Sequence, residues 1–254
     1  MNPNKQIIPR AMVMNEQTIR FDFGPQMSQE TFRIIQQFCQ VVEQDRNHLL
    51  EEVVPSNKTV TVFYRKELVN PCVIIEELLT KWMHRTDSDL RVNTRTLEIP
   101  VCYDALFSED IPRICDHTGL TREEVIAIHT GTSYKVYMIG FLPGFPYLGE
   151  LPEVLHVPRL EKPRLSVPKG TVGIGGTQTG IYPIESPGGW NIIGRTPLDL
   201  YCLNRVEPFL IRAGDQLQFR AISLETFNEM KEELAREPEM ILQFVKEGSQ
   251  CELI

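Results

Sequence analysis

Residues 175–197 read GGTQTGIYPIESPGGWNIIGRTP and hold six glycines and three prolines. So many backbone breakers exclude a helix or a long strand over this stretch. Large and specific side chains stand between the breakers, which a plain linker would not need. We therefore expect a domain of short strands and tight turns that hold polar side chains in place. Those side chains are Gln178, Tyr182, Glu185, Ser186, Trp190 and Arg195.

Candidate strands lie on both sides of this stretch, between residues 131 and 222. They are short, and their spacing is typical of a β-barrel or a β-sandwich. An earlier strand, LEIPVCY at 97–103, alternates apolar and polar residues, and Pro100 within it suggests an edge strand. The later candidates are VYMIGF at 136–141, KGTVGI at 169–174, WNIIG at 190–194, LDLYCL at 198–203 and DQLQFRAI at 215–222.

Two short helices are expected between the strand at 97–103 and the later strands. The first lies near residues 109–117. The second begins at Thr121, whose hydroxyl and the side chain of Glu124 can each bond the other's free backbone amide in a capping box. His129 follows Val125 by four residues, so we expect both side chains on the inward face of this helix.

The first part of the chain predicts a small α+β domain. Strand patterns at 18–23 and 59–64 alternate with helices that begin at Ser28 and Asn70. The polar segment 84–96 then predicts a domain boundary. The predicted fold is an α+β N-terminal domain at 1–93, a mainly-β domain at 94–222 that forms a barrel or a sandwich, and a helical, acidic C-terminal tail at 223–254.

Composition argues against several classes of protein. The formal net charge is −8, and residues 223–254, with eight acids and three bases, supply −5 of it. No basic cluster points to nucleic acid. The six cysteines lie far apart, which predicts reduced thiols and no metal site. Neither a signal peptide nor an apolar run of membrane-spanning length is evident, so we expect a cytoplasmic protein without membrane association.

His129 has the strongest local argument for a catalytic role, because its helix directly precedes the barrel region. A core histidine with satisfied hydrogen bonds explains the same pattern, and the sequence leaves both interpretations open. Arg159 and Arg164 each follow a proline, which suits recognition of a carboxylate or a phosphate. Ordinary surface arginines would give the same pattern. No P-loop or dinucleotide fingerprint accompanies them.

Residues 138–152, MIGFLPGFPYLGELP, place three aromatic side chains on a loop stiffened by prolines. Such a loop can wall a ligand pocket, or it can simply cover the end of the barrel. Together with 175–197 it suggests a polar-lined pocket without a recognisable nucleophile–base pair. The expected pocket wall is Phe141, Phe145 and Tyr147, and the expected binding residues are Arg159, Arg164, Gln178, Tyr182, Ser186, Trp190 and Arg195.

Two long runs carry a resemblance to a known family. They are HTGLTREEVIAIHTGTSYKVYMIGFLPGFPYLGELP at 117–152 and VPKGTVGIGGTQTGIYPIESPGGWNIIGRTPL at 167–198. Both resemble the B subunit of bacterial 5-oxoprolinase, a family also known as KipI and related to one half of the carboxyltransferase region of urea carboxylase. The resemblance is dense across about residues 97–222. Lys169 and Thr177 depart from the small residue and the glycine that are usual in the family.

The resemblance implies a cyclophilin-like barrel in one component of a heteromeric enzyme that is inactive without its partners. With an A subunit and a homologue of the C subunit, the enzyme would hydrolyse 5-oxoproline to glutamate at the expense of ATP. His129 is then the candidate for polarising the amide or moving a proton. Arg159, Arg164 and Arg195 are the candidates for anion binding. Which of the components binds ATP is left open.

Three other functions fit parts of the resemblance. The KipI name implies an inhibitor that binds a sporulation sensor histidine kinase and blocks its autophosphorylation. A carboxyltransferase half of a urea carboxylase would need biotin domains, which this sequence does not contain. A peptidyl-prolyl isomerase would rest on the barrel fold alone. We prefer the enzyme component, because protein binding alone does not explain so polar a pocket.

Overall fold

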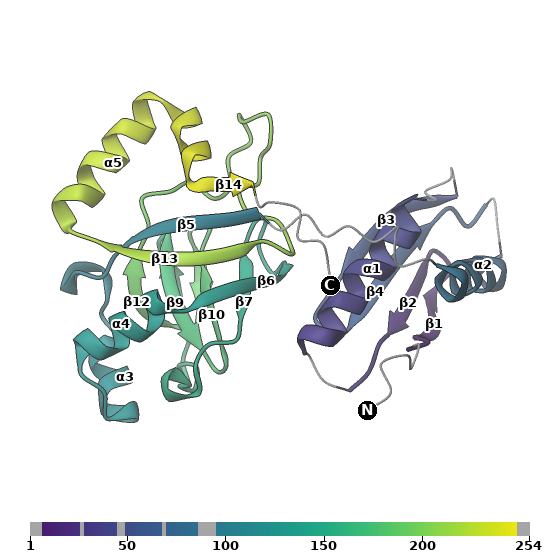
Figure 1. Ribbon diagram of the computed structural model, residues 1–254, viewed down its shortest axis with the longest axis horizontal. Coiled ribbons are helices and arrows are strands. Elements are labelled where there is room, and N and C mark those ends of the chain that lie inside the picture. The colour runs from purple at the N-terminus through teal and green to yellow at the C-terminus, as the bar shows by residue number, and fades with distance from the viewer. Residues whose placement is uncertain (1–6, 26–27, 45–48, 68–69, 86–94, 248–254) are drawn as a thin grey trace. The chain divides into compact units, whose positions relative to one another are not determined.

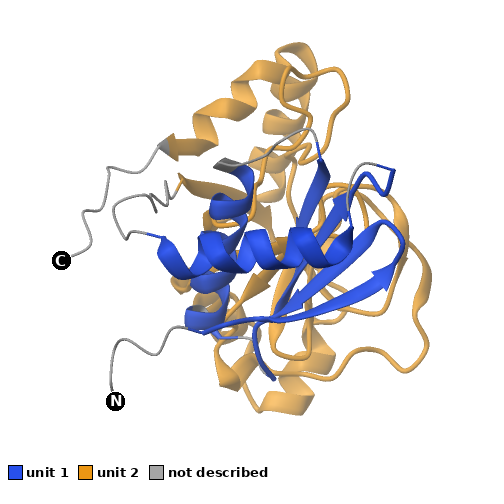
Figure 2. Cartoon of the chain, turned by 90° about the vertical axis from the view of Figure 1, so that its right-hand side faces the viewer, with its two compact units in different colours: residues 1–92 blue, residues 93–254 orange. Residues whose placement is uncertain are grey.

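The computed structural model describes residues 7–25, 28–44, 49–67, 70–85 and 95–247. The chain divides into two units, residues 1–92 and 93–254, which Figure 2 colours separately. The division falls in the polar segment 84–96, of which residues 86–94 lie outside the described ones. Among the described residues, no helix combines the length and the apolar composition needed to cross a bilayer.

The first unit contains a four-stranded antiparallel sheet in the order β1-β2-β4-β3, with two helices. Helix α1 packs against β3 and β4. Helix α2 begins at Asn70, whose side chain accepts a hydrogen bond from the Cys72 amide as an N-cap does. The elements are β1 (Arg10–Asn15), β2 (Thr18–Asp22), α1 (Gln29–Gln44), β3 (Leu50–Pro55), β4 (Thr59–Tyr64) and α2 (Pro71–His84).

The second unit is built on a seven-stranded barrel in the order β12-β9-β10-β7-β6-β13-β5 (Figure 1), so the predicted barrel is confirmed. It closes where Arg195 of β12 pairs with Cys102 of β5, and β13 runs parallel to β5. Alternate side chains of the strands fill its interior. The strands are β5 (Arg95–Cys102), β6 (Ser133–Ile139), β7 (Pro146–Gly149), β9 (Thr171–Gly175), β10 (Gln178–Ile181), β12 (Asn191–Arg195) and β13 (Gln216–Ile222).

Helices α3 (Ile111–Thr118) and α4 (Arg122–Gly131) follow β5, close to their expected positions. The predicted capping box of α4 is confirmed. The Glu124 amide donates to the Thr121 hydroxyl, and the Thr121 amide donates to the Glu124 carboxylate at 2.8 Å. The buried side chains of α4 include His129, so its inward orientation is confirmed as well.

Two strand predictions were wrong. β5 is not an edge strand, because it pairs with β13 on one side and with β12 and β14 (Val245–Glu247) on the other. Pro100 is tolerated because β14 pairs with residues 95–97 and β12 with Cys102, which leaves its backbone without a partner on that side. Residues 198–203 form no strand and contribute only an isolated bridge.

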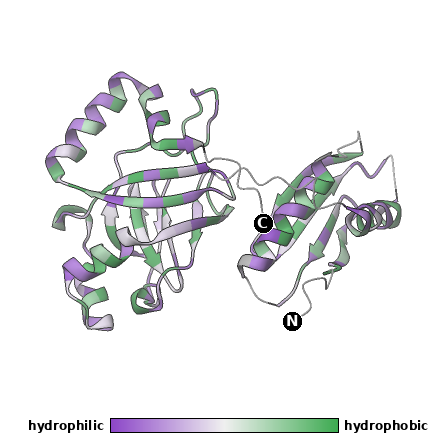
Figure 3. Cartoon of the chain, viewed as in Figure 1, coloured by the Kyte–Doolittle hydropathy of each residue, from purple (hydrophilic) through white to green (hydrophobic). Residues whose placement is uncertain are grey.

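The segment after residue 222, expected as a separate acidic tail, lies in the same unit as the barrel. Its helix α5 (Leu224–Arg236) is predominantly hydrophilic (Figure 3). The following 3-10 helix η4 (Pro238–Phe244) nevertheless places Ile241 and Phe244 in the apolar core of the barrel. Burial of apolar side chains therefore fixes this segment on the barrel despite its negative charge.

Candidate functional site

Phe145, Tyr147, Tyr182 and Trp190 form an aromatic cluster on the second unit. The Phe145 ring lies 5.3 Å from Tyr182 and 5.5 Å from Trp190 between centroids, nearly perpendicular to both. Aromatic rings prefer this edge-to-face geometry. Phe145, Tyr182 and Trp190 are buried, and Tyr147 is half-buried. The cluster is therefore a firmly packed apolar floor with one partly exposed edge.

Glycines in β9 and β10 make room for this cluster on the outer face of the barrel. A Cβ on Gly175 would lie 2.8 Å from the Trp190 ring, and one on Gly180 would lie 3.0 Å from it. The alternate residues of the same strands, Ile174 and Thr179, point the other way into the barrel interior. The sequence suggested that these glycines form turns. The structure places them in strands, where the absence of a side chain lets the Trp190 ring approach the sheet closely.

Arg159 lies over the cluster as an exposed cation. Its guanidinium carbon is 5.3 Å from the centre of the Trp190 ring, within the range of a cation–π interaction. No ion pair to Arg159 occurs among the described residues. Burial raises the pKa of Tyr182, while a backbone hydrogen bond at Trp190 and the charges of Arg159 and Arg164 lower it. Both guanidinium groups therefore act on the same phenol.

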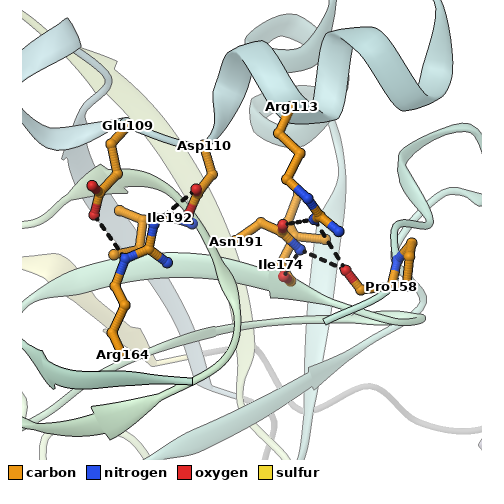
Figure 4. Close-up of polar contacts among 8 residues, drawn as sticks. All are labelled: Glu109, Asp110, Arg113, Pro158, Arg164, Ile174, Asn191 and Ile192. Carbon is orange, nitrogen blue, oxygen red and sulfur yellow. Dashed lines mark hydrogen bonds and ion pairs between the residues drawn. The ribbon is translucent and has the colours of Figure 1, made fainter. Parts of the chain in front are cut away.

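Arg164 begins the short strand β8 (Arg164–Val167) and is held by two acids that precede α3 (Figure 4). Its Nε lies 3.1 Å from a Glu109 oxygen and its Nη2 lies 2.8 Å from an Asp110 oxygen. The other Asp110 oxygen accepts the Ile192 amide at 2.6 Å, which ties Arg164 to β12. The third nitrogen, Nη1, is buried and has no hydrogen-bond partner among the described residues.

A neighbouring network fixes the loop that carries Arg159 (Figure 4). The buried Asn191 side chain donates to the carbonyl oxygens of Pro158 at 3.1 Å and Ile174 at 3.0 Å. Arg113 of α3 donates to the Asn191 oxygen and, at 3.3 Å, to the Pro158 carbonyl. Because Pro158 directly precedes Arg159, these bonds set the position from which the arginine extends.

Asp110→Asn is expected to destabilise the barrel unit by about 1–3 kcal/mol. The contact with Arg164 would no longer be an ion pair, and the Ile192 amide would lose its charged acceptor. Glu109→Gln changes the exposed acid on the same arginine and should cost less than about 1 kcal/mol. Urea unfolding followed by tryptophan fluorescence measures both variants. Equal losses would show that Asp110 is no more important than a surface partner.

Gln178 adds an amide to the face that carries the aromatic cluster. It lies two residues before Gly180 in β10, so both residues point to the same side of the strand. Its Nε2 is buried without a hydrogen-bond partner among the described residues, a state that a ligand's carbonyl oxygen would relieve. The face therefore offers a cation, a guanidinium N–H and an amide donor above an aromatic floor. A small, flat anion that also carries a carbonyl group suits this set.

The structure separates the other predicted binding residues from this face or places them at its rim. Arg195 lines a different cavity. Ser186, in the short strand β11 (Ser186–Gly188), is buried and donates to the Pro187 carbonyl at 3.3 Å. Phe141 is 66% exposed, and its ring centroid lies 5.9 Å from that of Phe145 with the two rings perpendicular. It belongs to the rim of the cluster rather than to a closed wall.

His129, the predicted catalytic residue, lies in the barrel interior. It is fully buried, its Nδ1 is 2.8 Å from the Tyr103 hydroxyl, and its Nε2 is 2.9 Å from the Thr179 hydroxyl. Burial lowers its pKa to about 3, so the ring is neutral at physiological pH. Thr179 and Gln178 point to opposite faces of β10. This geometry fits the core-histidine interpretation, in which His129 supports the barrel.

Sequence reasoning missed the residues that orient the site, namely Glu109, Asp110, Arg113 and Asn191. An Asp before a proline-containing first turn is a helix-start signal, and Asp110 precedes such a turn of α3. Its partner Arg164 lies 54 residues further along, which no local pattern reveals. The described residues contain no group of three or more His, Cys, Asp or Glu side chains that could hold a metal ion.

Comparison with known proteins agrees with this architecture. Residues 9–211 match the family described as carboxyltransferase domain, subdomain C and D. The chain is 36% identical to the 5-oxoprolinase B subunit of Bacillus subtilis (strain 168), over 87% of this chain and 95% of that protein. It is 44% identical to the 5-oxoprolinase B subunit of Escherichia coli O157:H7, over 66% of this chain and 76% of that protein.

The fold also occurs in a much larger protein. The crystal structure of the Kluyveromyces lactis urea carboxylase aligns with 96% of this chain at a TM-score of 0.72, and the aligned part makes up 26% of that chain. The identity is 16%, so this likeness concerns the fold alone. From the family match and the two bacterial relatives, the chain belongs to the carboxyltransferase subdomain C and D family and, within it, to the B subunits of 5-oxoprolinase.

Proposed function

We propose that this chain is the B subunit of an ATP-dependent 5-oxoprolinase, a cyclic amide hydrolase. In the proposed reaction the ring of 5-oxo-L-proline is opened by water to give L-glutamate, while ATP and water give ADP and phosphate. The chain acts together with the A and C subunits of that enzyme. The observation that carries the proposal is the 36% identity to the Bacillus subtilis B subunit over 87% of this chain.

The geometry of the aromatic cluster supports this substrate. 5-Oxoproline is a small, flat ring that carries one carboxylate and one amide. Its carboxylate would pair with Arg159, which has no ion pair among the described residues. Its ring would lie against the exposed edge of Tyr147, and its carbonyl oxygen would accept the unused Nε2 hydrogen of Gln178. Arg164 would present its remaining N–H from the side of α3.

These groups bind and orient a substrate, and none of them is a nucleophile paired with a base. We therefore expect the isolated chain to show no turnover, with activity only after the partner proteins are added. Orientation alone can lower a reaction barrier considerably when the reacting group is held beside a partner's catalytic groups. ATP enters the proposal as the co-substrate of the complete enzyme.

Deletion of this gene in the source organism tests the proposal. We expect 5-oxoproline to accumulate and growth on 5-oxoproline as the nitrogen source to be lost. Return of the intact gene should restore both. Unchanged 5-oxoproline levels together with unchanged growth would contradict the proposed function.

A further inference from the structure

A cavity of about 390 Å³ lies between the barrel and the C-terminal helices α5 and η4. The barrel contributes Lys169, Gly170 and the segment 195–199, and the helices contribute the opposite wall. Gly170 has a φ of 80°, and a Cβ there would lie 2.5 Å from the Thr196 carbonyl oxygen, so only glycine allows the two segments to meet. The close contact between Gly170 and Thr196 therefore fixes the shape of this wall of the cavity.

Positive charge dominates the lining of this cavity. Among the described residues, four cations and one acid, Asp199, line the cavity, which leaves three net positive charges. The whole chain carries a net charge of −8, so the positive charge gathered in this cavity is opposite in sign to the net charge of the protein. The four cations are Lys169, Arg195, Arg205 and Lys231.

Lys169 pairs with Asp199 at 2.7 Å, whereas the other three cations have no carboxylate partner among the described residues. Arg195 donates from Nε to the Lys169 carbonyl oxygen at 3.0 Å, and burial lowers its pKa. Arg205 is 9% exposed, and within the described part of the chain it donates to the carbonyl oxygens of Asp199 and Pro208 alone, at 2.7 and 3.1 Å. Its Nε is buried and has no hydrogen-bond partner in the described part of the chain. A buried guanidinium group such as that of Arg205 and a half-buried one such as that of Arg195 favour an anionic ligand when no carboxylate pairs with them.

We propose that this cavity binds a small molecule that carries phosphate groups. One carboxylate would leave most of the charge of the lining unbalanced, whereas phosphate groups bring several charges and suit guanidinium N–H donors. The cavity is larger than a phosphate ion requires and falls in the size range of small-molecule sites. Phe227, Leu234 and Ile241 supply apolar surface for the remainder of such a ligand.

The wall formed by α5 and η4 follows residue 211, where the match to the family ends. Lys231 and the apolar side chains opposite Arg195 therefore come from outside the matched region. Ligand binding here does not depend on the proposed hydrolysis, because the cavity and the aromatic cluster have different lining residues.

Isothermal titration calorimetry with the full chain tests the proposal. The probes are ADP, pyrophosphate, inorganic phosphate and L-glutamate, which separate a nucleotide from a free phosphate and from a carboxylate. We expect saturable binding of at least one phosphate probe, tighter than glutamate, and weaker at high ionic strength. Lys231→Gln and Arg195→Gln should each raise the Kd about tenfold.

Arg236→Gln is the matched control, since Arg236 is an exposed cation of the same helix that pairs with Glu232. It should leave the Kd unchanged. Absence of binding by every phosphate probe would overturn the proposal, as would a Kd that neither Lys231→Gln nor Arg195→Gln alters. Preferential binding of glutamate would replace the phosphate ligand by a carboxylate. These measurements involve no turnover of 5-oxoproline, so their outcome is separate from that of the gene deletion.

Discussion

Arg159→Gln is expected to lower kcat/KM for 5-oxoproline about 100-fold in the assembled enzyme. Arg159 stands over Trp190 and has no ion pair among the described residues, so its charge is available to the substrate carboxylate. Glutamine keeps a polar side chain at this position but removes the charge. Because the carboxylate does not react, its contact should be equal in the ground and transition states. Most of the loss should therefore appear in KM rather than in kcat.

Lys162→Gln is the matched control for this variant, because it removes an exposed cation from the same loop. It should change kcat/KM by no more than about twofold. Equal urea midpoints for the two variants would show that neither change unfolds the barrel. Unchanged kinetics in Arg159→Gln would remove this arginine from the proposed site. Equal losses in both variants would indicate that the loop attracts anions only through its total charge.

Local signals in the sequence predicted local structure reliably. The strand at 59–64 and the helix starts at Asn70 and Thr121 were predicted where the structure has them. Each depends on side chains within a few residues of one another, so the interaction is visible in the sequence. The spacing of the short strands predicted a barrel or a sandwich, and only the resemblance to a known family favoured the barrel.

Long-range packing is what the sequence did not reveal. The glycines of 175–197 suggested turns around a ligand, yet Gly175 and Gly180 lie in strands beneath Trp190. A glycine signals free space above the backbone without identifying the group that fills it. Arg195 and Arg164 were both predicted to bind an anion, but strand β12 carries Arg195 to a different cavity. Which site an arginine reaches depends on which strands pair with one another. The sequence around each arginine does not contain that information.

The barrel is expected to lose stability as the pH falls below about 6.5, because of His129. The Thr179 hydroxyl donates to the Gly173 carbonyl, so it accepts from Nε2–H, and Nδ1 accepts the Tyr103 hydroxyl. A proton added at Nδ1 would point at the Tyr103 hydroxyl hydrogen, and no water could solvate the charge. Burial accordingly lowers the pKa of His129 to about 3. The unfolded chain therefore takes up the proton first. The stability that neutral His129 gives to the folded barrel is fully present above pH 6.5 and declines as the pH falls toward 3.

Tryptophan fluorescence can isolate this effect, because the chain has two tryptophans, Trp82 in the first unit and Trp190 in the second. In a Trp82→Phe background, urea unfolding followed through Trp190 should show a loss of about 2 kcal/mol between pH 7 and pH 5. His129→Gln removes the titrating group, so it should flatten this slope whatever its stability at pH 7. His117→Gln, on α3, should keep the slope. If His129→Gln keeps it too, other groups set the acid sensitivity of the barrel, and the neutral buried imidazole is not its cause.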